Sequence, residues 1–408
     1  MIIKSNPTKI PKNGSSSVGF LRMLKILYLS VAFVLTYYFF YLSEIQDVDN
    51  TAQIIDNTAQ IIDNIAQMSR INDSQDNCPN KIVWISASRG FTGNKMMDYA
   101  TVYVVARELK GGHVGVLCGQ RGDLDKMFKN IVLDDLPTEC QKRKEKQGFD
   151  FYNWDAGLEL HGIIYNRSHS VADVESFSAA HDDVSIKYYK WFPILYLKYL
   201  DELKYTFQFR DHIMTEAQTT IELVRRLYAG SKKPLLFVGT HVRRGDYKEH
   251  LKALYHMDLL GPSFFVKGME YFNDKFSDKY LVIFLAVSND DDWVTKHLKF
   301  EHFYIVSKNA ESDMALLSLC NHTITDYGTF GFWPSLFHGG EHYTTNAYED
   351  FIVATMYQIK RWTVINVTSP LVTSPYSDTW LREWGEPETA LTKPLNREPD
   401  GSVTTQLQ

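Results

Sequence analysis

The sequence predicts an α/β protein of two Rossmann-like domains that face a cleft, preceded by a single transmembrane helix and a stem. Three observations predict this fold class. Short apolar segments that favour strands alternate with helical patterns in two blocks of the chain. One uncharged apolar segment lies near the N-terminus. Charged and polar motifs follow the ends of several apolar segments, which is where parallel sheets bind their ligands.

The apolar segment near the N-terminus predicts a signal-anchor at residues 24–42, because Ile26–Leu42 contains no charged residue. The basic residues Lys4, Lys9, Lys12, Arg22 and Lys25 precede or begin this segment, and acidic residues follow it. The positive-inside rule therefore predicts a cytosolic tail at 1–23 and a luminal remainder, as in a type II membrane protein. A cleaved signal peptide is the alternative, but the basic segment is long and no A-x-A site follows.

A stem is expected at residues 43–80. It contains the seven-residue repeat DNTAQII-DNTAQII-DNIAQM over Asp49–Met68. The repeat has the spacing of a coiled-coil seam, so it leaves open a stem that forms a homodimer and a plain flexible stem.

Sequons and cysteines fit a luminal protein. N-x-S/T triplets occur at Asn72, Asn166, Asn321 and Asn366. We expect glycosylation at Asn72, Asn166 and Asn366, but not at Asn321, which has apolar surroundings. The four cysteines allow one or two disulfides whose pairing is left open, and the absence of a CxxC pair argues against structural zinc.

An N-terminal α/β domain is predicted at residues 81–232. Its expected strands are Lys81–Ala87 and His113–Leu117, with a helix over Asn94–Leu109 between them. Two further helices are expected at Trp191–Leu203 and Phe209–Leu227.

A C-terminal α/β domain is predicted at residues 233–365, followed by an extension at 366–408. Its expected strands are Leu235–Val242, Tyr280–Val287, Phe303–Val306 and His322–Thr325, and its expected helices are Pro262–Phe276 and Ser312–Leu319. We expect the chemistry where these strands end. The net charge of −6 provides no basic face, so nucleic acid is not an expected partner.

A charged motif follows the first strand of the C-terminal domain: Gly239–Tyr247 reads GTHVRRGDY. Arg243 and Arg244 at a strand end can bind a diphosphate, because guanidinium groups present fixed N–H donors and keep their charge. Asp246 is either a base or a partner that orients an arginine. A surface loop with local ion pairs is the alternative interpretation.

This motif resembles the H-x-R-R-x-D motif of the inverting, GDP-fucose-dependent galactoside α-1,2-fucosyltransferases. The segment Ser312–Gly340 is similar to the family's segment D-x-A-L-L-x-x-C-N-H-x-I…G-T-F-G-x-W…L-x-G-G. Ser288-Asn289 followed by Trp293, Gly93–Ala100 and Arg382-Glu383-Trp384 also resemble family blocks. The chain departs from the family's G-x-L-G-N pattern just before Asn94.

The resemblance implies a GT-B-like fold, a Golgi membrane location and transfer of fucose from GDP-fucose to the 2-hydroxyl of a galactose-terminated glycan. In it, Arg243 and Arg244 would hold the GDP diphosphate and stabilise its charge as it departs. The resemblance also implies that His241, Ser288 and Asn289 bind the donor. Asp313 would contact guanine, and Thr329 and Phe330 would contact phosphate and fucose.

The acceptor hydroxyl must lose its proton. Asp246 and Asp98 are the candidate bases, and a solvent relay without a dedicated base remains an alternative. No cofactor or metal is expected, because the arginines supply the positive charge. The acidic run Asn289–Asp292 is interpreted as a helix N-cap rather than as a metal site.

Two other kinds of function stay open. One is another luminal transferase: a fucosyltransferase of different linkage, or a sulfotransferase using the loop Ser86–Lys95 (SASRGFTGNK), which lacks a GK[ST] ending. The other is an inactive membrane-anchored glycan-binding protein.

Overall fold

The structure, a computed structural model, describes residues 60–64, 78–88, 90–166 and 170–367, together with two short strands at 396–397 and 403–404. The predicted tail, the apolar span at 24–42 and Asn72 lie outside these residues. Within the described part of the chain, no helix combines the length and apolarity needed to cross a membrane. Two compact units are present, Met1–Asp63 and Asn64–Gln408, and the following description concerns the second.

A small parallel sheet forms from the first strands of this unit, in the order β2-β1-β3. Its strands are β1 (Ile82–Ile85), β2 (Val114–Val116) and β3 (Val184–Ile186). The central strand is buried along its whole length, as its apolar sequence IVWI predicts for a strand covered on both faces. The helices of this part are α3 (Thr92–Glu108), α4 (Arg121–Met127), α5 (Thr138–Lys146), α6 (Asp155–Tyr165), α7 (Val171–Ala180), α8 (Pro193–Lys198) and α9 (Leu200–Thr206).

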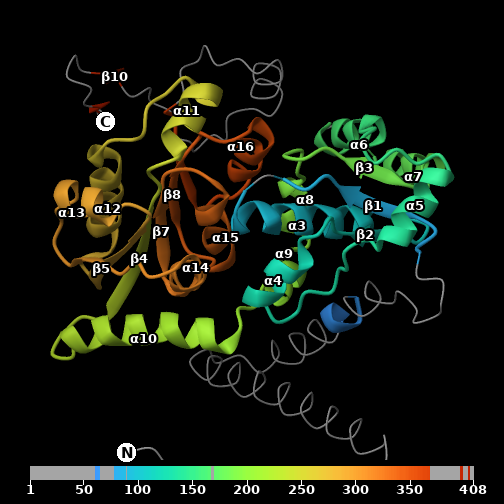
Figure 1. Cartoon of the computed structure of the whole chain (residues 1–408). Coiled ribbons are helices and arrows are strands. Elements are labelled where there is room, and N and C mark those ends of the chain that lie inside the picture. Colours follow the sequence, from blue (N-terminus) through green and yellow to red (C-terminus); the bar gives the residue numbers. More distant parts are fainter. Residues whose placement is uncertain are drawn as a thin grey trace, which may run out of the picture. The chain divides into compact units, whose positions relative to one another are not determined.

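A larger sheet of six parallel strands follows, in the order β6-β5-β4-β7-β8-β9 (Figure 1). Its strands are β4 (Leu235–Val242), β5 (Leu281–Ser288), β6 (Phe303–Ile305), β7 (His322–Thr325), β8 (His342–Thr345) and β9 (Trp362–Ile365). From β4 the chain first adds strands on one side and then returns to add β7, β8 and β9 on the other. The order of strands therefore reverses between β4 and β7.

Helices cover both faces of the larger sheet. One face contacts α12 (Pro262–Phe276) and α13 (Asp291–His297), and the other contacts α14 (Ala310–Leu319) and α15 (Thr329–Phe337). Outside α14 lies α10 (Asp211–Leu227), whose residues Ile213, Ala217, Ile221 and Val224 are buried at helical spacing. The remaining helices are α11 (Tyr247–Tyr255) and α16 (Asp350–Met356).

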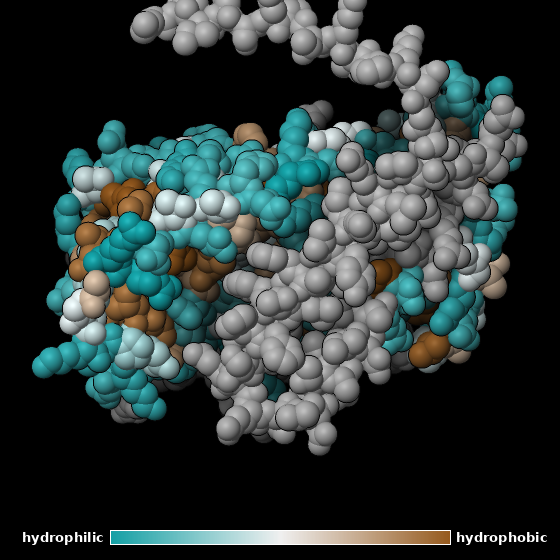
Figure 2. Space-filling model, turned by 90° about the horizontal axis from the view of Figure 1, so that it is seen from below, coloured by the Kyte–Doolittle hydropathy of each residue, from teal (hydrophilic) through white to brown (hydrophobic). Residues whose placement is uncertain are grey.

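Seen from below, the surface is mainly hydrophilic with separate apolar patches (Figure 2). Leu223 and Leu227 of α10 belong to the exposed apolar residues. These two leucines lie one turn apart on the helix, and small exposed apolar patches of this kind are normal on protein surfaces.

The predicted elements agree closely with the observed ones in the C-terminal part. The predicted bounds of β4, α12 and β7 are confirmed to the residue, and β5 is shifted by one position. The helix expected over Trp191–Leu203 is wrong as one element, because two short helices, α8 and α9, meet at Tyr199. Helices α4–α7 and strand β3 were not predicted, because α4 and α5 consist mainly of charged residues and β3 has only three residues.

The structure pairs Cys78 with Cys140, which links the segment before β1 to α5. Cys320 is buried and Cys118 is exposed, each as a free thiol.

The two sheets are built from residues on either side of the expected boundary at 232/233, but no feature of the structure fixes that boundary. It stays a prediction.

Candidate active site

The point at which the strand order reverses organises the site. Parallel sheets of this kind bind ligands beyond the carboxyl ends of the strands at the reversal. Here β4 lies between β5 and β7, with Val242 beside Ser288 and His241 beside Thr325. The motif after β4, the segment after β5 and the turn after β7 therefore meet at one edge of the sheet.

Arg243 presents its side chain at this edge. Its guanidinium Nη2 donates to both carboxylate oxygens of Asp246, at 2.8 and 2.9 Å. The same guanidinium lies 6.0 Å from the ring centre of Phe91 and 5.7 Å from that of Tyr247. The Arg243 side chain is 22% exposed, whereas that of Asp246 is 62% exposed. Asp246 is thus the ion-pair partner of Arg243, and the choice between an orienting residue and a base stays a prediction.

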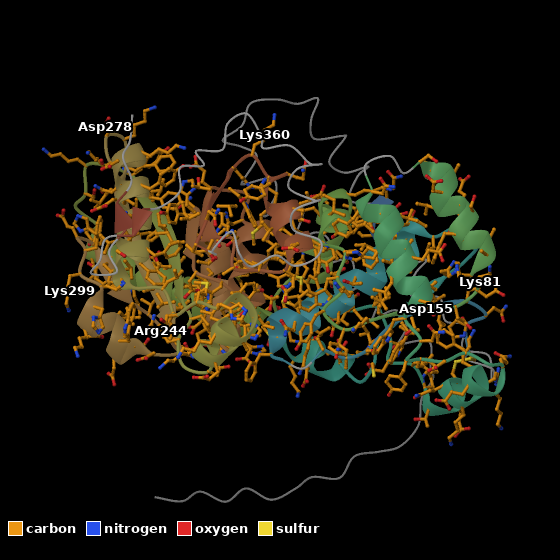
Figure 3. The ribbon with its side chains drawn as sticks, turned by 90° about the horizontal axis from the view of Figure 1, so that it is seen from above. Lys81, Asp155, Arg244, Asp278, Lys299 and Lys360 are labelled. Atoms are coloured by element: carbon orange, nitrogen blue, oxygen red, sulfur yellow. A yellow bond between two sulfur atoms is a disulfide. The ribbon has the colours of Figure 1, made fainter. Side chains whose placement is uncertain are left out.

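Arg244 is anchored more firmly than Arg243. Its guanidinium lies 3.9 Å from the ring centre of Trp293 and donates to the Leu260 carbonyl at 2.7 Å. Its backbone N–H donates to Asn289 Oδ1 at 2.8 Å, and Asn289 Nδ2 donates back to the Arg244 carbonyl. Arg244 is labelled in Figure 3, on the loop that follows β4. Asn289, expected to bind the donor, fixes the backbone of the second arginine.

Ser288 has a similar supporting position. Its hydroxyl donates to the Val242 carbonyl at 2.8 Å, and its backbone N–H donates to Ser307 Oγ at 2.9 Å. The first bond holds the end of β4 against the end of β5, directly before the arginine pair, and the second joins β5 to the segment after β6.

A buried pair of titratable groups, His241 and Asp326, supports the arginines from inside the fold. Asp326 is fully buried, and it accepts hydrogen bonds from the backbone N–H groups of Arg243 at 2.7 Å and Tyr327 at 2.9 Å. Burial raises the pKa of Asp326 to about 8, and burial together with Arg243 lowers the pKa of His241 to about 3. Each group is therefore held in its neutral form near pH 7.

The His241 ring is almost completely buried, so little of it is accessible to a ligand. It is 6% exposed, its ring stacks on Phe330 with centroids 5.0 Å apart, and its Nδ1 lies 3.6 Å from Asp326 Oδ1. Nδ1 has no hydrogen-bond partner among the described residues. Sequence reasoning missed Asp326, although it lies within the block that resembles the family, between β7 and the Gly328 turn.

A cavity of about 440 Å³ opens beside the arginine loop. Its lining residues are Ser288, Asn289, Asp290, Asp291, Asp292, Ser307, Lys308 and Asp313. Three of the predicted donor-binding residues, Ser288, Asn289 and Asp313, therefore share one cavity. The Asp313 carboxylate accepts from the Lys308 backbone N–H at 2.9 Å, and burial raises the pKa of Asp313 to about 7.

The acidic run at this cavity begins a helix. Asp290 is the N-cap of α13 and accepts from the Trp293 backbone N–H at 3.0 Å, while Asp291 and Asp292 occupy the first turn. The predicted capping role of this run is therefore confirmed. The N-terminus of a helix favours negative charge, because its backbone N–H groups lack partners within the helix. Over the described residues, no group of three or more His, Cys, Asp or Glu side chains has an arrangement suited to a metal ion.

The turn after β7 joins the site to the N-terminal part of the unit. Gly328 has a φ of +84°, which favours glycine, and α15 begins at Thr329. Thr329 Oγ1 donates to Asn94 Oδ1 at 2.6 Å, and Trp333 Nε1 donates to the Gly93 carbonyl at 3.1 Å. A Cβ at Gly93 would lie 2.7 Å from the Thr329 backbone, so only glycine permits this close approach.

Asp98 has surroundings that do not suit a base. It is fully buried on α3 and accepts hydrogen bonds from the Ser88 N–H and hydroxyl, Gln120 Nε2 and Trp191 Nε1. Both of its oxygens are thereby occupied away from solvent. Through these hydrogen bonds Asp98 connects the β1–α3 loop to the segment before α8.

The loop considered for a sulfate donor is likewise occupied by internal contacts. Lys95 pairs with Asp123, and Asn94 is bound to Thr329.

The predicted sequons Asn166 and Asn366 are exposed, and Asn366 Oδ1 accepts from Asn346 Nδ2 at 3.0 Å. Their glycosylation stays a prediction.

These residues define an α/β protein whose larger sheet places two arginines and a buried aspartic acid at its strand reversal. Residues 50–365 match the model of the family described as Glycosyl transferase family 11. The chain belongs to this family.

Similar proteins carry the name galactoside α-(1,2)-fucosyltransferase. The chain is 26% identical to galactoside α-(1,2)-fucosyltransferase 2 of Pongo pygmaeus over 265 residues, which cover 64% of this chain and 70% of that protein. It is 26% identical to galactoside α-(1,2)-fucosyltransferase 1 of Saimiri boliviensis boliviensis, covering 63% of this chain and 66% of the relative.

Among solved structures, a variant of Arabidopsis thaliana FUT1 in complex with GDP is similar with a TM-score of 0.39 and 14% identity, covering 71% of this chain and 75% of that one. The NodZ α-1,6-fucosyltransferase soaked with GDP-fucose is similar with a TM-score of 0.38 and 14% identity. The similarity covers 63% of this chain and 92% of that one.

Proposed function

We propose that this chain is a galactoside α-1,2-fucosyltransferase, which transfers L-fucose from GDP-fucose to the 2-hydroxyl of a galactose on a glycan. Membership of glycosyl transferase family 11 and the names of its relatives support the reaction. The arginine pair at the strand reversal is the observation that carries the mechanism. It presents an accessible guanidinium, Arg243, beside an anchored one, Arg244.

The proposed reaction breaks the bond between fucose C1 and the β-phosphate oxygen, whose electrons leave with GDP. The guanidinium groups stabilise the negative charge that grows on the departing diphosphate. The N-terminus of α15 adds backbone N–H groups near Thr329 and Phe330, at the positive end of the helix. Asp313, in the cavity beside Asn289, accepts the guanine N–H groups.

The acceptor hydroxyl attacks C1 from the face opposite GDP, so the β-linked donor gives an α-linked product. Its proton passes to solvent or to Asp246, the accessible one of the two candidate bases. A divalent metal is not required in this proposal, since Arg243 and Arg244 supply the charge that a metal would otherwise provide.

We also propose a membrane location and a domain arrangement for the enzyme. We place the chain in the Golgi membrane with residues 24–42 as a type II anchor, and with two Rossmann-like domains in a GT-B-like arrangement. The charge asymmetry around 24–42 and the sequons support this setting.

One experiment tests the function. The detergent-solubilised full-length chain is incubated with GDP-fucose and a neutral β-galactoside, released GDP is quantified, and the product linkage is determined by NMR. Fucose in α-linkage on galactose O2 is the expected result. Fucose on another hydroxyl indicates a fucosyltransferase of different linkage, and binding of galactoside without release of GDP indicates an inactive glycan-binding protein.

A further inference from the structure

The small sheet has a second strand reversal, and no residue at it has a role in donor binding. From β1 the chain adds β2 on one side and β3 on the other. Parallel sheets bind ligands beyond the strand ends at such a point. The residues there are Ser86, directly after β1, and Lys187 and Tyr188, directly after β3.

An aromatic surface lies at this second reversal. Trp154 Nε1 donates to Ser86 Oγ at 3.1 Å, which fixes the indole over the end of β1. The rings of Trp154 and Tyr188 meet edge to face with centroids 6.0 Å apart. Tyr188 is 42% exposed, so its side chain is accessible from solvent. Asp155, the residue that follows Trp154 and begins α6, is labelled in Figure 3.

A cation completes the surface. The Lys187 ammonium lies 5.0 Å from the ring centre of Trp154 and 5.9 Å from that of Tyr188. In the described residues, no carboxylate lies within ion-pair distance of Lys187. The charge is therefore held on the aromatic surface without a neutralising partner.

The loop that presents these groups is tightly constrained. Lys190 N–H donates to the Lys187 carbonyl at 3.0 Å, and Tyr189 has a φ of +59°, which an aromatic residue rarely adopts. Trp191 Nε1 donates to Asp98 Oδ1 at 2.7 Å, which ties the loop to α3. Backbone strain of this kind persists where the surrounding structure enforces it, and it gathers at binding sites.

The surface is connected to the donor site by one loop. Ser86 begins the β1–α3 connection, and Phe91, 76% exposed, ends it beside the Arg243 guanidinium. Five residues span at most roughly 18 Å even when fully extended. An oligosaccharide of a few rings can therefore reach from this aromatic surface to the donor.

We propose that Trp154, Lys187 and Tyr188 form an acceptor subsite that binds a sugar ring carrying, or adjoining, an acidic group such as a sulfate ester. The inference rests on the proposed function. The aromatic faces pack against the C–H face of the pyranose, and the ammonium pairs with the anion. The subsite makes the enzyme prefer an acidic galactoside over the neutral galactoside of the same length.

Steady-state kinetics of the full-length chain test this with N-acetyllactosamine and its form sulfated on the N-acetylglucosamine. We expect kcat/KM for the sulfated acceptor to exceed that for the neutral one by about threefold at low salt, and the difference to shrink in 0.5 M NaCl, as for an exposed ion pair. Lys187→Gln removes the difference, and Lys187→Arg retains it. Lys232→Gln, at an exposed lysine before β4, is the matched control and leaves it unchanged.

Tyr188→Ala tests the stacking contact. It raises KM for both acceptors by about fivefold, with kcat and the KM for GDP-fucose unchanged. A purely structural role would change the GDP-fucose KM or the melting temperature as well, and that result overturns the proposal. Transfer at wild-type efficiency and selectivity in both Lys187→Gln and Tyr188→Ala also overturns it.

Failure of the proposed function gives a different result. If no galactoside stimulates GDP release, saturation-transfer NMR of the sulfated acceptor on the intact protein still reports the subsite. Signals from the sulfated sugar that disappear in Tyr188→Ala support it, and their absence in the wild-type chain refutes it.

Discussion

The carboxyl group of Asp326 accepts the backbone N–H of Arg243 at 2.7 Å, although the two residues lie at the ends of different strands. The same carboxyl group accepts the Tyr327 N–H and lies 3.6 Å from His241. Asp326 thereby fixes the backbone on which the arginine pair depends. It is a positioning residue, because its full burial keeps it from the substrate.

Asp326→Ala is expected to weaken GDP binding and folding together. The change leaves the N–H groups of Arg243 and Tyr327 without acceptors, at about 1–3 kcal/mol for each that stays buried. Calorimetry of GDP binding and urea unfolding measure the two effects. Asp326→Asn keeps one acceptor oxygen and is expected to lose less of both. Unchanged GDP affinity in Asp326→Ala would show that the Arg243 backbone needs no such support.

The two arginines are expected to differ in their effect on stability. Arg243→Ala should reduce kcat/KM by about 10²-fold or more while leaving the melting temperature within a degree or two, because its pair with Asp246 is exposed. Arg244→Ala should reduce both, since Arg244 packs on Trp293 and binds the Leu260 carbonyl. Turnover close to wild type in both variants would exclude the diphosphate role.

Asp246→Asn separates an orienting residue from a base. An orienting Asp246 predicts a loss of about tenfold or less in kcat/KM, mainly through a higher KM for GDP-fucose, with the shape of the pH profile kept. A base predicts a fall of about 10²–10⁴-fold in kcat. Kinetics across pH 5–9 decide between the two, and Lys248→Gln, at an exposed neighbour on α11, is the control.

Binding of GDP-fucose is expected to strengthen as pH rises. Burial raises the pKa of Asp313 to about 7, and the guanine N–H donors need the ionised carboxylate. Below pH 7 the protonated form dominates, so affinity falls by about tenfold per pH unit there and levels off above about pH 8. GDP-fucose is the suitable probe, because its diphosphate lacks the terminal phosphate ionisation. Calorimetry of Asp313→Asn should give weak, pH-independent binding.

Removal of divalent metal is expected to leave transfer intact. Asp290 caps α13, and two guanidinium groups supply the charge at the diphosphate. Initial rates with GDP-fucose are compared in excess EDTA and in excess Mg²⁺ or Mn²⁺. Equal rates agree with the arginine mechanism. A rate that depends on metal, and that falls in Asp291→Asn, would restore the aspartate–metal interpretation.

The sequence by itself predicted several of the strands and helices that carry the proposed donor site. The apolar run of β4 is long and bounded by Pro234 and the charged motif, so both ends can be read from local composition. The arginine pair and the Gly328 turn follow such segments closely, and Asp313 lies in the first turn of the helix after β6. Their placement at one edge follows from the rule that parallel strands end on the same side.

Only the tertiary structure decided which residues support these groups. Asp326 looks like any polar residue in a turn, and its role comes from the pairing of β4 with β7. Trp154 contacts Lys187 and Tyr188 while its indole bonds to Ser86 at the end of β1, and β1 pairs with β3 with Val83 beside Val184. Local patterns record burial and period, whereas a contact between distant segments depends on strand order, which no local pattern contains.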